Sequence, residues 1–376
     1  MRRTLGVAVV GCGHIAPKHV EAIRATPGLE LRAICDIDRT QRRVWAEKLA
    51  VPGFADIKDV LARTEIDIVS ICTPNYLHVP MARAALAVGK HAVVEKPVAL
   101  SSAEAIALDR AFLAGGLCLF VVLQVRFNPA VLAVADVVRA GGLGRLYLAS
   151  LAQRWNRRDD YFASPGIAGT GIAGTSIAGT GNVGSDSIGA GNWHGVKALE
   201  GGALFTQGVH YIDLLLELAG PIAEVSANTR TLAHDIETED AAVAQLVFRS
   251  GALGTLEFTL DVYEKNLEAS LSLFGETGSI VLGGPAANEI TLWNVKDHAK
   301  PEGLAVAAPN DYGGAYVGSP PNHGAIYANV AARLIDGTEQ IAVTAASAAR
   351  SIIIIEAIYE SARTGCPVTI WEAETR

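Results

Sequence analysis

Val93-Val94-Glu95-Lys96-Pro97-Val98 ends an apolar run with an ionisable pair and a proline. The valines favour a strand, and Pro97 stops it because its nitrogen has no hydrogen to donate. A buried lysine needs a partner, and Glu95 is the nearest opposite charge. The ordinary interpretation is a strand that ends at the surface with a solvated Glu-Lys pair. The place of this segment in the chain favours a second interpretation, in which Lys96 belongs to a ligand site.

The first strand carries a glycine-rich turn. An apolar run at residues 5–10 leads into Gly11-Cys12-Gly13-His14-Ile15-Ala16, and residues 17–25 have helical spacing. In this G-x-G-x-x-(G/A) arrangement the first glycine allows a tight turn, the second lets the backbone approach a pyrophosphate, and the third residue is small enough for helix and strand to pack. We therefore expect a dinucleotide to lie against Gly11, Cys12, Gly13, His14 and Ile15, although the side chains of His14 and His19 are interpreted as packed or solvated.

An acidic residue follows the second strand. Residues 29–34 form that strand, and Asp36 lies about 20 residues after Ala16, where a ribose-binding acid is expected. A carboxylate there accepts from the ribose hydroxyls and repels a 2′-phosphate, which predicts NAD as the cofactor. The nearby Arg39, Arg42 and Arg43 would accommodate a phosphate, so NADP is the less favoured alternative.

The alternation of strands and helices continues through the first third of the chain. Strand patterns at residues 66–71, 91–94 and 117–123 alternate with helical patterns at 41–49, 57–63, 79–88 and 102–114. This order predicts an α/β fold with a doubly wound parallel sheet. Ligands of such sheets bind beyond the carboxyl ends of the strands, so Lys96 would stand over the cofactor. The other strand ends supply further candidates for cofactor binding: Thr73, Pro74, Asn75, His78, Glu95, Gln124 and Arg126.

The pattern changes after Pro129. Helices are predicted at residues 130–139, 327–335 and 345–362, and strands at 145–154, 367–371 and in succession over 222–293. We expect a Rossmann domain at 1–126 and an α+β domain with a large, mostly antiparallel sheet at 127–376. Residues 166–190 divide into five glycine-rich pentapeptides, which predicts a flexible excursion from the second domain.

A second candidate for proton chemistry lies after this tract. From Ala203 onward the apolar spacing is helical, and Thr206, His210 and Asp213 fall three or four residues apart on one face. Histidine is suited to accept a proton from an alcohol as a hydride leaves. The competing interpretation is a core histidine bonded to Asp213. Two stretches that each carry one protonatable group favour the chemical role for Lys96 and His210.

Composition limits the class of protein. A chain of 376 residues exceeds the usual size of a single core, and half of its residues are hydrophobic. The net charge of −8 argues against a nucleic-acid-binding protein. The longest apolar stretch, at 114–125, is shorter than the ~20 residues that span a bilayer, so no membrane partner is expected. The N-terminus has no signal-peptide pattern, and the five cysteines show no C-x-x-C spacing, so we expect a cytoplasmic protein without disulfides or metal.

Together these motifs resemble the glucose-fructose oxidoreductase / inositol dehydrogenase / rhizopine-catabolism (Gfo/Idh/MocA) family of nicotinamide-dependent sugar oxidoreductases. Glu95-Lys96-Pro97 looks like the family's E-K-P signature, and the resemblance covers nearly the whole chain in the expected order. The other matching segments are Gly11 to Ala16, Thr73-Pro74-Asn75 with His78, Arg126-Phe127-Asn128-Pro129, Gly201-Gly202-Ala203-Leu204 and His210-Tyr211-Ile212-Asp213. Segments around His19, His78 and His210 are most similar to the branch that oxidises the 3-hydroxyl of UDP-N-acetylglucosaminuronic acid.

The resemblance implies an NAD-dependent dehydrogenase that acts on a small sugar or nucleotide-sugar, with Lys96 and His210 at the sugar. It further implies a homodimer or homotetramer formed through the large sheet. It places at the substrate Lys96, Arg126, Asn128, Trp193, Thr206, Gln207 and His210. The chain departs from the family in two respects, since Thr206 stands where several relatives have an acidic or amide residue, and the pentapeptide tract is not a family feature.

Three alternative functions stay open at this stage. The first is an inositol or free-sugar dehydrogenase. The second is a glycosidase that uses tightly held NAD for transient oxidation, and the third is a cofactor-binding regulator without turnover.

Overall fold

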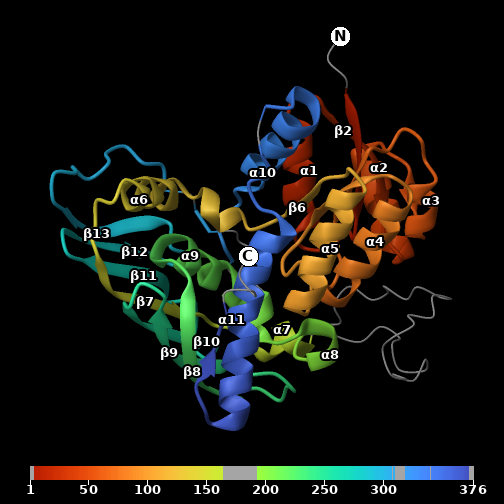
Figure 1. Cartoon of the computed structure of the whole chain (residues 1–376). Helices are drawn as coiled ribbons and strands as arrows, with labels where there is room; N and C mark the ends of the chain where they lie inside the picture. Colours follow the sequence, from red (N-terminus) through yellow and green to blue (C-terminus); the bar gives the residue numbers. More distant parts are fainter. Residues whose placement is uncertain (1–3, 164–192, 307, 310–317, 339, 372–376) are drawn as a thin grey trace.

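The computed structural model describes residues 4–163, 193–306, 308–309, 318–338 and 340–371, which form two sheets with helices packed around each (Figure 1). The pentapeptide tract at 166–190 lies outside the described residues. In the part of the chain that is described, no helix is long and apolar enough to cross a membrane.

The N-terminal sheet is the predicted doubly wound sheet. Its six strands are parallel and lie in the order β3-β2-β1-β4-β5-β6, in which β1 is central because the chain winds outward from it in both directions. The two-residue edge strand β3 was not predicted, and β6 is shorter than the apolar run at 117–123. The elements are β1 (Leu5–Val10), α1 (Ala16–Ala25), β2 (Leu29–Cys35), α2 (Arg39–Leu49), β3 (Gly53–Phe54), α3 (Ile57–Leu61), β4 (Ile68–Ile71), η1 (Asn75–Leu77), α4 (His78–Ala87), β5 (His91–Val94), α5 (Ser102–Ala114), β6 (Leu119–Val121) and η2 (Gln124–Phe127).

The second sheet has eight strands in the order β13-β12-β11-β7-β10-β9-β8-β14. Among the described strands of this sheet only β7 and β10 pair in parallel, so the predicted mostly antiparallel sheet is confirmed. Its elements are α6 (Pro129–Arg139), β7 (Leu146–Arg154), α7 (Asp159–Ala163), α8 (Lys197–Glu200), η3 (Leu204–Gly208), α9 (Val209–Ala219), β8 (Ile222–Arg230), β9 (Ala241–Phe248), β10 (Leu253–Thr259), β11 (Glu268–Gly275), β12 (Gly278–Gly283), β13 (Glu289–Val295), α10 (His323–Ala331), η4 (Ala332–Asp336), α11 (Ala345–Thr364) and β14 (Val368–Thr369).

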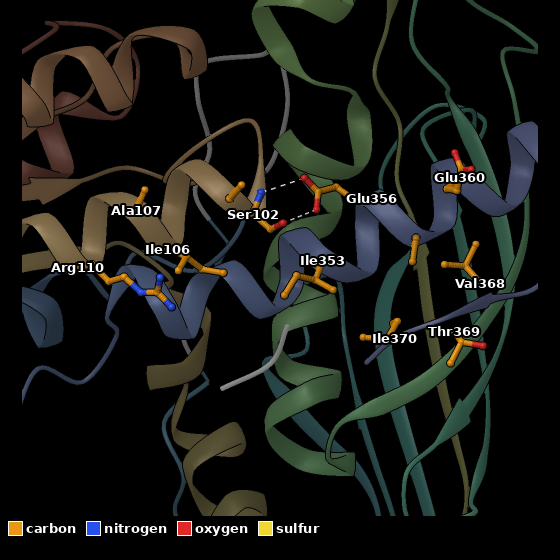
Figure 2. A pocket seen from close by; sticks show the side chains of 12 residues that line it. Ser102, Ile106, Ala107, Arg110, Ile353, Glu356, Glu360, Val368, Thr369 and Ile370 are labelled. Atoms are coloured by element: carbon orange, nitrogen blue, oxygen red, sulfur yellow. Dashed lines mark hydrogen bonds between the residues drawn. The ribbon is translucent and has the colours of Figure 1, made fainter. Parts of the chain in front are cut away.

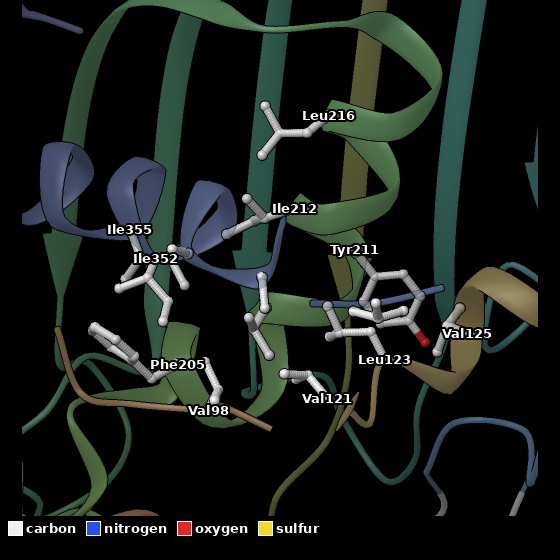
Figure 3. Close-up of a cluster of buried hydrophobic side chains, with 14 of the residues drawn as sticks. Val98, Val121, Leu123, Val125, Phe205, Tyr211, Ile212, Leu216, Ile352 and Ile355 are labelled. Carbon is white, nitrogen blue, oxygen red and sulfur yellow. The ribbon is translucent and has the colours of Figure 1, made fainter. Parts of the chain in front are cut away.

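Helices α9 and α11 join the sheet to the N-terminal domain through a continuous apolar core. Figure 3 shows Ile212 of α9 and Ile352 of α11 facing Phe205 and, from the N-terminal domain, Val98 and Val121. The face of the sheet away from these helices exposes apolar side chains on β7, β9 and β10, namely Leu148, Val243 and Leu253. The predicted oligomer through this sheet stays a prediction.

A helix from the last part of the described chain packs against the first domain. Helix α10 packs on α1, and Ile326, Tyr327 and Val330 belong to the same buried cluster as the strands of the N-terminal sheet (Figure 1). Residues 323–331 therefore help to cover the domain that the sequence assigned to 1–126.

The core between the domains generates a stability prediction. Ile212→Ala removes a fully buried side chain and should lower the free energy of unfolding by about 2–5 kcal/mol, measured by urea denaturation. Leu113→Ala is the matched control, because Leu113 is 77% exposed and should change stability by about 0.5 kcal/mol or less. Equal losses in the two variants would contradict this assignment of the core.

Candidate functional site

The glycine turn leaves room for a ligand. Gly11 has a φ of +91°, and a Cβ on it would lie 2.7 Å from the carbonyl oxygen of Cys72, so a side chain does not fit. A Cβ on Gly13 would meet no atom within 4 Å. The first glycine is thus required by the close approach of β4, and the second faces open space at the start of α1. This combination fits the pyrophosphate of a dinucleotide.

Asp36 follows β2 and is held by backbone amides. Its two carboxylate oxygens accept from the N–H of Cys12 at 2.7 Å and from the N–H of Asp38 at 2.8 Å. Burial raises the pKa of Asp36 in spite of these two bonds. Arg42 donates to the carbonyl oxygens of Asp36 and Ile37, at 2.7 and 3.2 Å, which occupies one of the arginines considered for a 2′-phosphate.

Lys96 links the two domains. Its Nζ donates to the carbonyl oxygen of Thr206 at 2.6 Å, across the junction between β5 and η3. The expected Glu95–Lys96 ion pair was wrong, since no ion pair of the Lys96 ammonium occurs among the described residues and Glu95 binds His19 instead, at 2.9 Å. Burial lowers the pKa of Lys96, while Glu95 and Glu200 oppose that shift and Arg157 reinforces it.

His210 lies one turn beyond Thr206. It is 3% exposed, and its Nδ1 is buried without a hydrogen-bond partner in the described part of the chain. The alternative of a core histidine bonded to Asp213 does not hold, because both oxygens of Asp213 accept from Arg126 at 2.5 Å. Burial, reinforced by the charge of Lys96, holds the pKa of His210 well below its ordinary value. This shift favours the neutral ring, which can accept a proton.

Thr206 and Gln207 are fixed by neighbouring polar groups. The hydroxyl oxygen of Thr206 accepts from Asn75 at 3.0 Å, so the loop after β4 also reaches η3. Gln207 accepts from the guanidinium of Arg157 at 2.8 Å and donates to the hydroxyl of Tyr161 at 2.8 Å. Both Thr206 and Gln207 therefore lie at the junction with Lys96, as the sequence predicted for substrate-binding residues.

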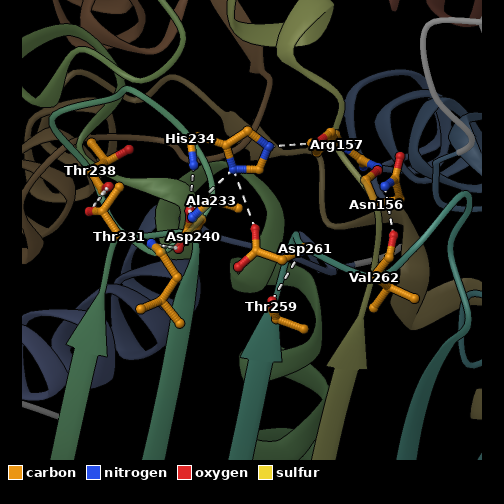
Figure 4. A network of polar contacts seen from close by, with 11 residues as sticks. Asn156, Arg157, Thr231, Ala233, His234, Thr238, Asp240, Thr259, Asp261 and Val262 are labelled. Carbon is orange, nitrogen blue, oxygen red and sulfur yellow. Dashed lines mark hydrogen bonds and ion pairs between the residues drawn. The ribbon is translucent and has the colours of Figure 1, made fainter.

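Sequence reasoning missed Arg157. It is 1% exposed, and its guanidinium lies over the rings of Trp155 and Tyr161, 4.9 and 5.5 Å from their centroids. His234 contacts its carbonyl oxygen at 2.7 Å and pairs with Asp240 and Asp261, as Figure 4 shows. The available signal was the run of aromatic and polar residues directly after a predicted strand at 145–154.

Other predicted site residues make contacts within the protein. The ring nitrogens of His78 lie 2.6 Å from the carbonyl oxygen of Pro97 and 2.8 Å from that of Thr73, so His78 ties the loops after β4 and β5 together. Asn128 is fully buried and donates to the carbonyls of Ala286 and Ala287.

The remaining candidates lie around this junction. Gln124 is 4% exposed, with an Oε1 that has no partner among the described residues, and Trp193 is half-buried with its ring 3.8 Å from that of His194. Thr73 donates to the sulfur of Met81 at 3.6 Å, and Pro74 immediately precedes the short helix η1. Whether any of these residues contacts a ligand stays a prediction.

A cavity of about 580 Å³ lies elsewhere, between α5, α11 and β14 (Figure 2). Ser102 of α5 donates to Glu356 of α11 at its edge through both its N–H and its hydroxyl. None of the predicted site residues lines this cavity, so the chemistry is assigned to the junction around Lys96.

Known proteins resemble this chain over both domains. Residues 5–122 match the family model described as an oxidoreductase family with an NAD-binding Rossmann fold, and residues 131–281 match the GFO/IDH/MocA C-terminal domain. The chain belongs to the Gfo/Idh/MocA family. The resemblance stated from the sequence is confirmed.

Two solved structures of family members are similar throughout. The WlbA dehydrogenase of Chromobacterium violaceum, in complex with NADH and UDP-GlcNAcA, is 32% identical with a TM-score of 0.82, over 98% of this chain and 97% of that chain. The WlbA dehydrogenase of Bordetella pertussis, with the same two ligands, is 30% identical with a TM-score of 0.80, over 98% and 99%. Levoglucosan dehydrogenase of Pseudarthrobacter phenanthrenivorans is 24% identical over 80% of this chain and 79% of its own length.

This family member is an NAD-dependent oxidoreductase, and the described residues fit the cofactor. The turn at Gly11 and Gly13 and the N-terminus of α1 would hold the pyrophosphate, and Asp36 would accept from the adenosine ribose. The strand-end residues Thr73 and Lys96 would lie toward the nicotinamide.

Asp36 generates the first prediction for the site. Asp36→Ala removes both the acceptor and the negative charge, so NADH should bind roughly 10–100-fold more weakly and NADPH should lose less affinity. Fluorescence titration of both cofactors measures the ratio of their dissociation constants. Asp36→Asn is the matched control, because it keeps an acceptor oxygen and removes only the repulsion. An unchanged ratio in both variants would contradict the role of Asp36.

The Arg126–Asp213 pair generates a stability prediction. Asp213→Asn leaves a mostly buried guanidinium without its charge partner and should lower the free energy of unfolding by about 3–5 kcal/mol, measured by urea denaturation. Asp136→Asn breaks the exposed pair with Arg139 and should change stability by about 1 kcal/mol or less. A small loss for Asp213→Asn would show that Glu217, 3.3 Å from Arg126, suffices as a partner.

Proposed function

We propose that this protein transfers a hydride from a secondary hydroxyl of a sugar, sugar acid or nucleotide-sugar to NAD, and that a UDP-N-acetylhexosaminuronate oxidised at its 3-hydroxyl is the substrate. One observation carries the proposal. An ammonium from the N-terminal domain, Lys96, is bonded to the backbone of Thr206, one turn before the neutral imidazole of His210. These two groups supply a donor and an acceptor of protons on either side of the junction.

The proposed roles follow from protonation states. NAD, when bound, accepts the hydride that leaves the carbinol carbon. His210 accepts the hydroxyl proton, because its lowered pKa keeps it neutral at pH 7. Lys96 donates a hydrogen bond to the same oxygen and stabilises the negative charge that develops there. The carbinol thus loses one hydride and one proton and becomes a carbonyl group.

The choice of an acidic sugar rests on charge and on the relatives. Lys96 and Arg157 place two cations at the junction, which favours a substrate with a carboxylate. The WlbA dehydrogenases, similar over nearly the full length, were solved with UDP-GlcNAcA. Levoglucosan dehydrogenase and D-apiose dehydrogenase are more distant relatives, at 24% and 25% identity, and they support the alternative of a free-sugar dehydrogenase.

The catalytic assignment predicts large losses of turnover. Lys96→Ala and His210→Ala should each lower kcat by roughly 10²–10⁴-fold, because each removes a group that acts on the reacting hydroxyl. The measurement is NADH absorbance with NAD and a panel of UDP-sugars, sugar acids, inositols and free sugars. Arg139→Ala, on the exposed end of α6, is the matched control and should turn over like the parent. Parent-like turnover in Lys96→Ala or His210→Ala would show that the roles are misassigned.

The pKa of His210 predicts the acid side of the pH profile. Because this pKa lies well below 6.5, the base form persists as the pH falls, and kcat/KM should be retained through pH 6.5 before it declines. In Lys96→Met the positive charge that helps to lower the pKa of His210 is absent, so this pKa should rise. The residual activity should then begin to decline at a higher pH than in the parent. A decline that begins above pH 7 in the parent would contradict His210 as the base.

A further inference from the structure

Behind Lys96 lies a buried cluster that the mechanism does not use. Glu95 precedes Lys96 in the chain, yet no ion pair joins the two among the described residues, and the carboxylate contacts side chains of α1 and α10 instead. Its Oε1 lies 2.9 Å from Nε2 of His19 and 3.4 Å from Nε2 of His323. Its Oε2 accepts the backbone N–H of Lys96 at 3.1 Å. The carboxylate therefore makes a hydrogen bond to His19, approaches His323 at ion-pair distance without a hydrogen bond, and accepts from the backbone of the lysine.

The ring nitrogen of His19 that does not face Glu95 contacts two buried hydroxyl groups. Nδ1 of His19 lies 2.8 Å from the hydroxyl of Tyr327 and 3.0 Å from that of Ser70, and these two hydroxyls are 2.7 Å apart. The side chains come from α1, β4 and α10 and from Glu95, which directly follows β5. The side chains of His19, Ser70, His323 and Tyr327 are at most 1% exposed. Water cannot take the place of any one partner without a rearrangement of the core.

The charges in the cluster are paired. Burial alone would lower the pKa of His19, but Cys72, Tyr327 and Glu95 raise it well above its ordinary value. Burial alone would raise the pKa of Glu95, but His19 and His323 hold it well below its ordinary value. Burial lowers the pKa of His323. These shifts favour the charged forms of His19 and Glu95 and the neutral form of His323.

We propose that His19 and His323 are positioning residues, which bind the Glu95 carboxylate and thereby keep it from pairing with the neighbouring ammonium. Lys96, the next residue in the chain, is a cation on which the charge of Glu95 already acts. A direct ion pair between them would draw Nζ away from the carbonyl of Thr206 and from the substrate hydroxyl. The two histidines thus leave the ammonium available for chemistry.

The inference rests on the proposed role of Lys96. Several charged groups around Lys96 affect the pKa of its ammonium. Glu95, Arg157 and Glu200 act on the ammonium, and the ammonium acts on His210. Of these groups, Glu95 is next to Lys96 in the chain. Its partner, His19 of α1, can be replaced by mutation. Loss of that partner changes the charge next to Lys96 without touching the substrate side of the site.

The test compares the parent with His19→Leu and His323→Leu. Competitive acetylation with acetic anhydride, read by mass spectrometry of the peptide that contains Lys96, measures the pKa of the ammonium without any substrate. In His19→Leu this pKa should rise by about 1 unit or more, because the freed carboxylate pairs with the ammonium. With NAD and UDP-N-acetylglucosaminuronic acid, kcat should fall about tenfold or more while the KM for NAD changes little. His323→Leu should shift both quantities in the same direction and by less.

Two further variants separate positioning from a merely structural role. In His19→Leu/Glu95→Gln the carboxylate charge is gone, so the pKa of Lys96 should return to its value in the parent or fall below it. Tyr327→Phe disturbs the same cluster but keeps the His19–Glu95 contact, and it should leave the pKa of Lys96 unchanged. Thermal melts identify any variant that does not fold, and His323→Leu then carries the test alone.

Three results would overturn the inference. The first is an unchanged pKa of Lys96 in folded His19→Leu and His323→Leu. The second is a raised pKa that the added Glu95→Gln does not reverse. The third is one equivalent of metal in the purified parent, because the three side chains would then be metal ligands. Failure of the proposed function is distinguishable, since Lys96→Ala would then match the parent in turnover whatever the acetylation experiment shows.

Discussion

The arrangement of the candidate site depends on a charge-assisted hydrogen bond between the two domains, from the ammonium of Lys96 to the carbonyl oxygen of Thr206. A buried ammonium is costly to desolvate, and a carbonyl dipole offsets less of that cost than a carboxylate would. The bond nevertheless fixes β5 against η3, and Asn75 adds a parallel link from the loop after β4. Two strand ends of the first domain are thereby held against the helix that carries His210.

The carboxylates around this junction are all bound to other groups. Glu95 is held by His19, Asp213 by Arg126, and Asp36 by two backbone amides. Glu95 and Asp213 are thereby paired with side chains other than Lys96, while the two backbone amides orient Asp36 and leave its charge in place. The junction therefore contains a cation, a neutral imidazole and a second cation at Arg157. This combination distinguishes the site from a structural ion-pair network, in which the lysine would be neutralised.

The sequence predicted the strand and helix order of the first domain because glycine turns and period changes are local signals. It also placed Lys96 at a strand end of the parallel sheet, whereas the expectation that His210 lies at the same site came from the family resemblance. The partners of the charged groups could not be predicted from such local signals. Glu95 was assigned to its neighbour Lys96, whereas its partners come from residues 76 and 228 positions away in the chain. Arg157 was missed because its burial depends on aromatic rings and on a histidine from a distant loop.

The docking of α10 on α1 has a consequence for synthesis on the ribosome. The first domain leaves the exit tunnel well before residues 323–331 have been translated. Until then Glu95 has His19 but not His323 within reach, and the apolar surface that Tyr327 and Val330 cover in the folded protein is exposed. A chain that stopped before residue 323 would therefore lack both the second histidine beside Glu95 and the apolar cover of the first domain.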